Sequence, residues 1–167
     1  MKQIGVAVFQ GLNNITGTVV FKDTVNGQCQ IKAVFTSLPP GKHGFHIHHS
    51  GDLRGEGCKL ACDHYHKGAP QSHGGPPSRS TTPRHTGDLG NIEGPEFQKT
   101  YLLPNVTVQE LIGRSIIVHE DEDDLGQGPF EDSQTTGHSG NRIGCAIIGR
   151  ADCPSTTKTR NRVTNTS

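Results

Sequence analysis

Gly44-Phe45-His46-Ile47-His48-His49 is the stretch of the sequence that decides most about the fold. Successive side chains of a β-strand point to opposite faces, so His46 and His48 would share one face, and Phe45 and Ile47 the other. An apolar pair toward a core and an imidazole pair away from it would suit a metal site on the wall of a sheet. A half-buried strand that merely carries polar histidines has the same pattern, so this stretch alone leaves both interpretations open.

The composition favours one β-rich domain. The 167 residues are enough for a single domain with a substantial core. Only 30% of them are hydrophobic, and 22 glycines and 10 prolines favour short strands joined by turns. The net charge of zero implies no general attraction to nucleic acid or to membranes. Because there is neither an apolar leader after Met1 nor a membrane span, we expect a cytoplasmic protein.

Alternating apolar residues predict eight strands. They are expected at residues 3–9, 15–22, 28–36, 42–49, 84–89, 97–103, 115–119 and 143–149. Ile4, Val6 and Val8 share one face of the first strand, and Cys29 lies on the apolar face of the third, which predicts a core position. Without a convincing helix, this pattern predicts an all-β Greek-key barrel or sandwich.

Two long segments interrupt the strands, at 50–83 and 120–141. Loops of this length inside a compact domain are usually functional or disordered, and the histidines of the first indicate a functional loop ordered by metal. Residues 154–167 lack apolar periodicity and are predicted to form a disordered tail, which leaves 1–153 as the folded domain.

Histidine is the outlying residue type. Eight of the ten histidines fall between His43 and His85. Candidate ligands form two groups, which are His46, His48 and His119 on strands, and His64, His73, His85 and Asp88 on the long loop and the strand that follows it. Three histidines with one carboxylate are a complete set for tetrahedral zinc. Histidines on rigid strands with an open coordination position suit a redox copper.

Five motifs resemble those of the copper/zinc superoxide dismutase family. In chain order they are GFHIHHSGD (44–52), HGGP (73–76), RHTGDLGN (84–91), VHEDEDDLGQG (118–128) and GNRIGCAIIGRA (140–151). The resemblance runs from about residue 3 to residue 153, and five motifs in the right order make it specific. It implies an immunoglobulin-like sandwich. It also implies an antioxidant enzyme that converts two superoxide anions and two protons to oxygen and hydrogen peroxide, with copper cycling between copper(II) and copper(I).

The resemblance implies one copper and one zinc per subunit. The copper ligands would be His46, His48, His64 and His119, and the zinc ligands His64, His73, His85 and Asp88. His64 would bridge the two metals and pass a proton to the substrate, since imidazole offers two ligating nitrogens on opposite sides of a rigid ring. The zinc would be structural because it has no redox chemistry.

Further roles follow from the same resemblance. Asp123 would link a copper histidine to a zinc histidine, and Arg142 would dock the superoxide anion. Cys58 and Cys145 would form an internal disulfide, although two buried free thiols are the usual state of such cysteines in an intracellular protein.

The sequence departs from the family at several positions. Cys62 and His66 are additional candidate ligands, although four ligands already complete a zinc site. Asp121 and Thr135 stand where lysines often help to draw in the anion, which predicts a slower reaction with a weak or unusual salt dependence.

The family resemblance also implies a homodimer, with a copper chaperone as a possible partner. The dimer contacts would lie near Gly51, at Ile112-Gly113 and near Ile148-Gly149. Ser50 replaces what is often an aromatic contact, which predicts a weaker interface.

Two rival functions remain to be weighed. One is a copper chaperone that contains a domain of this fold, and the other is a zinc-stabilised binding module without catalysis. Arg142 and the three histidines outside the zinc group favour the enzyme, because a purely structural module needs neither.

Overall fold

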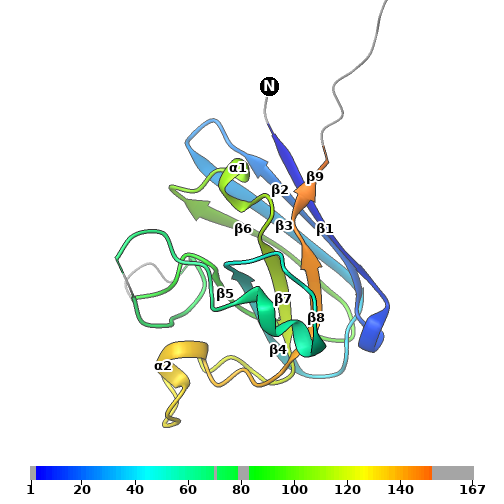
Figure 1. Ribbon diagram of the computed structural model, residues 1–167, viewed down its shortest axis with the longest axis vertical. Helices are drawn as coiled ribbons and strands as arrows, with labels where there is room; N and C mark the ends of the chain where they lie inside the picture. Colours follow the sequence, from blue (N-terminus) through cyan, green and yellow to red (C-terminus); the bar gives the residue numbers. More distant parts are fainter. Residues whose placement is uncertain (1–2, 70, 79–82, 152–167) are drawn as a thin grey trace, which may run out of the picture.

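The computed structural model describes residues 3–69, 71–78 and 83–151, and these form two antiparallel sheets packed face to face (Figure 1). The first sheet has the order β6 (Phe97–Pro104), β3 (Gln28–Ser37), β2 (Thr16–Asp23), β1 (Ile4–Gln10) and β9 (Gly149–Arg150). The second has the order β5 (Asp88–Glu93), β4 (Lys42–His48), β7 (Ser115–His119) and β8 (Arg142–Ile147). The all-β prediction is confirmed, as a sandwich of separate sheets. The predicted tail, 154–167, lies outside the described residues.

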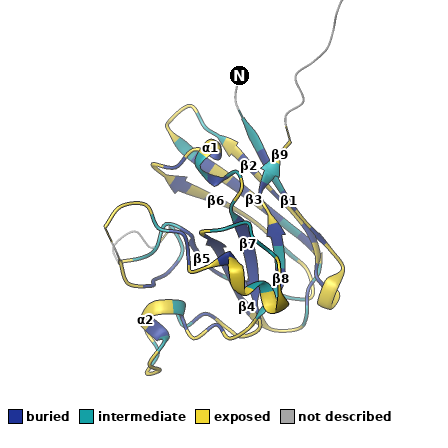
Figure 2. Cartoon of the chain, in the orientation of Figure 1, coloured by how far each residue is buried: buried dark blue, intermediate teal, exposed yellow. Residues whose placement is uncertain are grey.

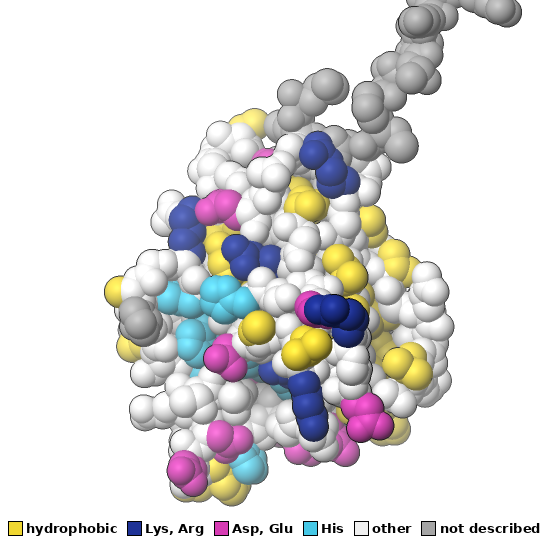
Figure 3. Space-filling model, in the orientation of Figure 1, with side chains coloured by type: hydrophobic (Ala, Val, Ile, Leu, Met, Phe, Trp, Pro, Cys, Tyr) yellow, Lys and Arg dark blue, Asp and Glu magenta, His cyan; other side chains and the backbone are white. Residues whose placement is uncertain are grey.

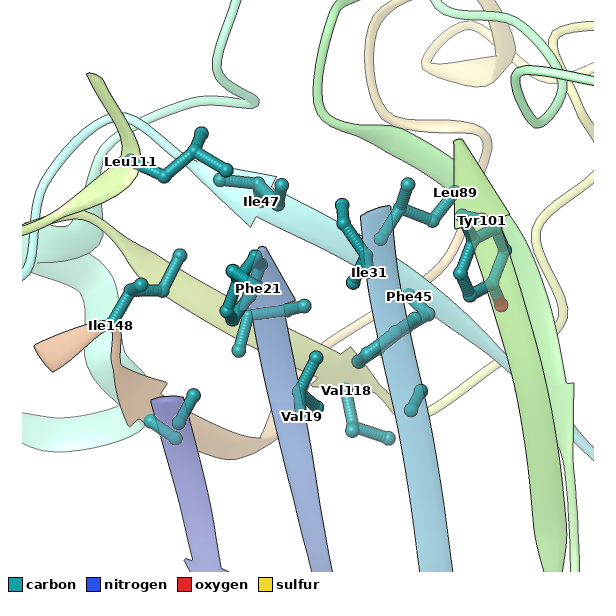
Figure 4. Packing of buried hydrophobic residues seen from close by; sticks show 14 of the residues in the cluster. Val19, Phe21, Ile31, Phe45, Ile47, Leu89, Tyr101, Leu111, Val118 and Ile148 are labelled. Atoms are coloured by element: carbon teal, nitrogen blue, oxygen red, sulfur yellow. The ribbon is translucent and has the colours of Figure 1, made fainter. Parts of the chain in front are cut away.

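The core fills the space between the two sheets. Phe21, Ile31 and Phe35 enter it from the first sheet, and Phe45 and Ile47 from the second. The rings of Phe35 and Phe45 meet edge to face with centroids 5.7 Å apart, a favourable geometry for two aromatic rings. Figure 4 shows Phe21, Ile31, Phe45 and Ile47 between the strands of the two sheets. Cys29 is buried in the same core, as predicted.

The inward face of β1 was not the one that its aliphatic residues indicated. Ile4, Val6 and Val8 share a face, but Val8 is 48% exposed, whereas Ala7 and Phe9 are buried. The ring of Phe9 packs on Phe35 with centroids 5.2 Å apart. Alternation predicts that the two faces of a strand differ, and the packing partners decide which face is covered.

Two predicted strands have different bounds in the structure. The strand expected at 84–89 is wrong in position, because β5 begins only at Asp88, after a turn in which the amide of Asp88 donates to the carbonyl of His85. The strand expected at 143–149 is divided at Ile148. Before this residue, β8 pairs with β7 in the second sheet. After it, the chain crosses to the first sheet, where Gly149 pairs with Val6 of β1.

The helices within the described residues are short, at three to six residues each. Two are α-helical, α1 (Val108–Leu111) and α2 (Ser133–Thr136), and two are 3-10, η1 (Leu12–Asn14) and η2 (Glu56–Ala61). The turn of α1 is stabilised by a capping box, in which Glu110 and Thr107 each bind the other's backbone amide. No helix within the described residues is long and apolar enough to cross a membrane.

Strand β4 is buried on both faces, as the dark ribbon in Figure 2 shows. One face meets the core, and the other is covered by the loops that follow β4 and β7. The first loop is held to the strand by the amide of Tyr65, which donates to the carbonyl of Ile47 at 2.7 Å. The two loops also bind each other, since the amide of His73 donates to the carbonyl of Gln134 at 2.8 Å. The histidine face of β4 is therefore enclosed by irregular chain.

Candidate metal centre

Four buried histidines from three parts of the chain meet on the outer face of the second sheet. His46 and His48 come from β4, His119 ends β7, and His64 comes from the loop between β4 and β5. One ring nitrogen of each lies within 4.8 Å of a ring nitrogen of every other. Four buried imidazoles this close together, with no carboxylate among them, offer only lone pairs and N–H groups to whatever lies between them.

In His46, His48 and His119, one ring nitrogen is hydrogen-bonded to a protein oxygen. The second nitrogen of each ring is left to face the other histidines of the group. Nδ1 of His48 donates to the carbonyl of Cys62 at 2.8 Å, and Nδ1 of His119 to the carbonyl of Gly140 at 3.3 Å. Their Nε2 atoms are then 3.3 Å apart. His46 is turned the other way: its Nε2 bonds Asp123 at 2.8 Å, and its Nδ1 is buried without a hydrogen-bond partner. Such an orphaned nitrogen is costly unless it binds something, and a metal ion would satisfy it.

A second group surrounds one oxygen of Asp88. Nδ1 of His64 lies 2.9 Å from Oδ1, Nδ1 of His73 3.1 Å from it, and Nδ1 of His85 3.3 Å from it. The other carboxylate oxygen accepts the amides of Gly74 at 3.0 Å and His85 at 2.8 Å, which fixes the orientation of the carboxylate. Three imidazoles and one carboxylate oxygen match the donor set of a closed zinc site.

His46 also lies within 4.8 Å of His64, His73 and Asp88. Its Nε2 is already bound to Asp123, so His46 completes the first group better than the second. His85 has its own contact with Asp88 and is the better fourth member of the second group.

His64 and Asp123 connect the two groups. His64 belongs to both. Asp123 bonds Nε2 of His46 with one carboxylate oxygen and Nε2 of His73, at 2.7 Å, with the other. Asn91 holds Asp123 in place, because its amide side chain both donates to and accepts from the Asp123 backbone. Asn91 was not singled out from the sequence, although it ends the motif RHTGDLGN.

Burial keeps the first group neutral. Loss of hydration, followed by the nearness of His64 or His46, lowers the pKa of His46, His48 and His119 well below the usual value. Burial of Asp88 opposes its charge, but hydrogen bonds from His64 and other histidines outweigh burial and lower the pKa of this carboxyl. At neutral pH the first group thus presents neutral imidazoles, and Asp88 is ionised. Burial of His73 opposes its charge, but hydrogen bonds to Asp123 and Asp88 outweigh burial and raise the pKa of this histidine to about 9, so a metal ion would have to displace a proton there.

A cleft opens from His48, His64 and His119 to the surface, and Arg142 lies at its side. The guanidinium donates to the carbonyls of Cys58 at 2.7 Å and Cys62 at 2.6 Å. A disulfide joins Cys58 to Cys145, so η2 and β8 hold the arginine between them. The predicted disulfide is therefore present in the structure.

Carboxylates and small polar residues line the mouth of the cleft. They include Asp63, Asp132 and Thr135. Asp121 is not among the lining residues; its backbone bonds Gly44 and Ser139 on the strand side of the loop. The expected effect of Asp121 on substrate entry therefore lacks support from its position, whereas Thr135 does line the cleft.

The extra cysteine and histidine of the loop do not join either group. Cys62 is exposed, with its thiol 3.5 Å from the carbonyl of Leu60. Nδ1 of His66 accepts the amide of Thr86 at 3.2 Å. Figure 3 shows histidine side chains gathered on this face of the molecule, over the loop that joins β4 to β5.

The backbone of Cys62 is strained. Its φ of 63° and ψ of −155° lie in a region that essentially only glycine adopts, at a cost of about 1–3 kcal/mol. Its carbonyl binds both His48 and Arg142, so the strain occurs where the backbone positions two residues of the cleft. Sequence reasoning weighed Cys62 only as a thiol and missed this backbone role.

Replacing Cys62 by glycine is expected to raise the free energy of unfolding by about 1 kcal/mol, after the greater flexibility of glycine in the unfolded chain is subtracted. Urea denaturation of both proteins measures the difference. Cys62→Ser, which keeps the β-carbon, is the matched control and should not stabilise. Equal stabilities of the glycine and serine variants would contradict the strain.

Comparison with known proteins agrees with this geometry. Residues 15–148 match the family model described as copper/zinc superoxide dismutase. The chain belongs to this family. A copper chaperone for superoxide dismutase from Rattus norvegicus is 38% identical over 156 residues, which are 90% of this chain and 55% of the relative. The corresponding chaperone from Mus musculus is 39% identical, over 87% of this chain and 53% of the relative.

An enzyme and a protein of known structure are also similar to this chain, with 40% and 32% sequence identity. The extracellular superoxide dismutase of Caenorhabditis elegans is 40% identical over 83% of this chain and 62% of its own length. The crystal structure of the clock protein EA4 has a TM-score of 0.78 and 32% identity, and the match covers 87% of this chain and 93% of that chain. This chain thus spans between about half and three fifths of the three sequence relatives.

Proposed function

We propose that this chain is a superoxide dismutase, which converts two superoxide anions and two protons to oxygen and hydrogen peroxide in antioxidant defence. The observation that supports this most is the group of His46, His48, His64 and His119 beneath an open cleft with Arg142 at its side. A site for structural zinc alone needs neither a second histidine group nor access from solvent.

The residues fit the two metals of the family. His46, His48, His64 and His119 would hold copper, because they offer neutral imidazole nitrogens, one of them orphaned, and leave a side open to the cleft. His64, His73, His85 and Asp88 would hold zinc. When bound, copper supplies an electron acceptor and donor that alternates between two oxidation states, and zinc supplies a fixed positive charge.

The protein's own side chains orient the ligands and the substrate. The carbonyls of Cys62 and Gly140 set the tautomers of His48 and His119, so that Nε2 carries the lone pair. Arg142 brings a fixed positive charge to the cleft, where it attracts and orients an anion. His64 has one nitrogen turned to Asp88, and its other nitrogen is available to hold a proton and deliver it to the reduced product.

His46→Ala tests the copper site, because it removes the orphaned nitrogen. After reconstitution with both metals, we expect the variant to keep about one zinc per chain, to lose copper, and to consume superoxide at least a hundredfold more slowly. Mass spectrometry of the metals and stopped-flow measurement of superoxide decay provide the two readouts. His66→Ala is the matched control, since His66 lies on the loop that follows β4, outside both groups.

The outcomes separate the candidate functions. Wild-type protein that takes up zinc but no copper would overturn the proposal and favour the binding module. Wild-type protein that takes up copper without consuming superoxide would favour copper delivery, the role in the names of the two mammalian relatives. Superoxide consumption that stays unchanged while His46→Ala removes copper would also overturn the proposal.

We further propose a homodimer. Near the positions named from the family resemblance, Gly51 packs against the carbonyl of Gly113, and Ile112 is half-buried. Ile148 is fully buried in its own subunit, so the adjacent Ile147, which is 49% exposed, is the better candidate for a contact. Such exposed apolar residues are typical of an interface when they lie together.

Ile147→Glu is expected to shift the protein from dimer to monomer, because a charge in an apolar interface is costly to desolvate. Sedimentation velocity at micromolar concentration measures the species present. Val8→Glu, at a residue of similar exposure on the other sheet, should leave the dimer intact. A monomeric wild type would refute the homodimer.

The cytoplasmic location stays a prediction. The extracellular relative from Caenorhabditis elegans and the Cys58–Cys145 disulfide are both compatible with an oxidising compartment as well. Fractionation of cells that express the native gene would distinguish the two locations.

A further inference from the structure

Asp132 at the mouth of the cleft is paired with a histidine that the proposed reaction does not use. Nδ1 of His138 lies 2.7 Å from Oδ1 of Asp132. Asp132 lines the same cleft as Arg142 and the copper-group histidines, and it forms the N-cap of α2. His138 itself is no ligand candidate: it lies on the loop after α2, outside both histidine groups.

The imidazole of His138 also lies flat on an aromatic ring. It stacks on Phe130 with centroids 3.6 Å apart and an interplanar angle of 10°. Figure 3 shows acidic, hydrophobic and histidine side chains together at the lower edge of the molecule, where Figure 1 places α2. The carboxylate on one side and the aromatic ring on the other hold the imidazole beside Asp132.

The charges around the mouth are few. Arg142 is positive, and Asp63 and Asp132 are negative, so these three groups together carry one negative charge. Thr136 also faces Asp132, as a neutral hydroxyl 3.3 Å from its other carboxylate oxygen. Since superoxide is an anion, a net negative mouth slows its entry, and neutralising one carboxylate removes that repulsion. Histidine is the side chain whose charge changes between about pH 5 and 8.

We propose that the Asp132–His138 pair is a pH-dependent control of anion entry into the cleft. With His138 protonated, the pair is neutral and anions enter faster; with His138 neutral, Asp132 repels them. This inference rests on the proposed function for the identity of the anion, but the pair acts on any small anion that enters the cleft. His138 is a rate-modulating residue of the entrance and does not touch the substrate.

The test uses metal-loaded protein and two probes. The first is kcat/KM for superoxide between pH 6 and pH 8.5, and the second is the affinity for azide, an unreactive anion that absorbs on binding copper(II). Both should fall about threefold as the pH rises in the wild type, less than the roughly tenfold effect at the low end of electrostatic steering, because the pair is half-exposed. Asp132→Asn should raise both values at every pH and keep their fall, because His138 still titrates, whereas His138→Asn should keep the low values throughout.

Two controls make the test specific. His66→Asn removes a nearby histidine outside the pair and should retain the pH dependence. In copper-free, zinc-loaded protein, the pKa of the Asp132 carboxyl, which the hydrogen bond from His138 lowers, should rise in His138→Asn; an NMR titration of Asp132 reports the pair without any activity.

The outcomes keep the two proposals apart. Azide affinity and kcat/KM that depend equally on pH in the wild type and in His138→Asn would overturn this inference while the dismutase proposal stands. His138-dependent azide binding in a protein that consumes no superoxide would overturn the dismutase proposal and support the control of anion entry.

Discussion

Removal of the disulfide is expected to lower the free energy of unfolding by about 4–5 kcal/mol, because the bond closes a loop across 87 residues of sequence. The variant should be Cys58→Ser together with Cys145→Ser, since a Cys58 left alone would be free to pair with the exposed Cys62. Urea denaturation of the variant and of the oxidised wild type, both without metals, measures the difference.

The same variant should impair the cleft. The disulfide fixes η2 to β8, and η2 supplies the Cys58 carbonyl that binds Arg142. If the dismutase proposal holds, kcat/KM should fall by tenfold or more while copper content changes little. Cys29→Ser, at a buried cysteine between the sheets, is the control for a destabilised protein with an intact cleft. A double variant that loses less than about 1 kcal/mol would contradict the structural role.

Gly137→Ala is expected to weaken zinc binding by about 10–100-fold, the usual cost of disturbing a residue that orients a ligand. A β-carbon at Gly137 would overlap both Oδ1 of Asp123 and Nε2 of His73, the two atoms that form the bond between them. The ring of His73 would have to move, and its Nδ1 would then lose its position beside Asp88. Competition with a chromophoric chelator measures the zinc affinity.

Gly27→Ala separates this clash from backbone strain. Gly27 has a φ of +72° against +69° for Gly137, and its added β-carbon would meet nothing within 4 Å. Both variants should therefore lose a similar free energy of unfolding from the positive φ, about 1 kcal/mol. Only Gly137→Ala should lose zinc affinity. Equal zinc affinities of the two variants would mean that Asp123 does not position His73.

Much of the fold could be predicted from local pattern. The apolar face of the third strand correctly predicted a core position for Cys29, which lies on the buried face of β3 with Ile31, Ala33 and Phe35. The buried face of β1 was harder to predict, because aliphatic residues alternate there with Ala7 and Phe9. Both faces of the strand therefore carry apolar side chains. The division of the last strand at Ile148 depends on a change of partner from β7 to β1, for which a single strand carries no local signal.

The candidate site, like the fold, could be predicted only in part from local pattern. The placement of His46 and His48 on one face of a strand, opposite Phe45 and Ile47, follows from the two-residue period of β-structure alone. By itself that period did not distinguish a metal site from a polar strand. The positions of His64 and His119 favour a metal site, because the structure brings them to the same face as His46 and His48.

The sequence by itself determined which residue types are available: a strand with paired imidazoles, a loop rich in histidine, and motifs that resemble one family. Only the tertiary structure decided which nitrogen of each ring faces inward, since that depends on the carbonyls of Cys62 and Gly140 and on Asp123, all distant in sequence. It also decided that Asp132 and Thr135, and not Asp121, line the cleft. Hydrogen bonds and electrostatic fields depend on distances in space, which the order of residues along a chain does not specify.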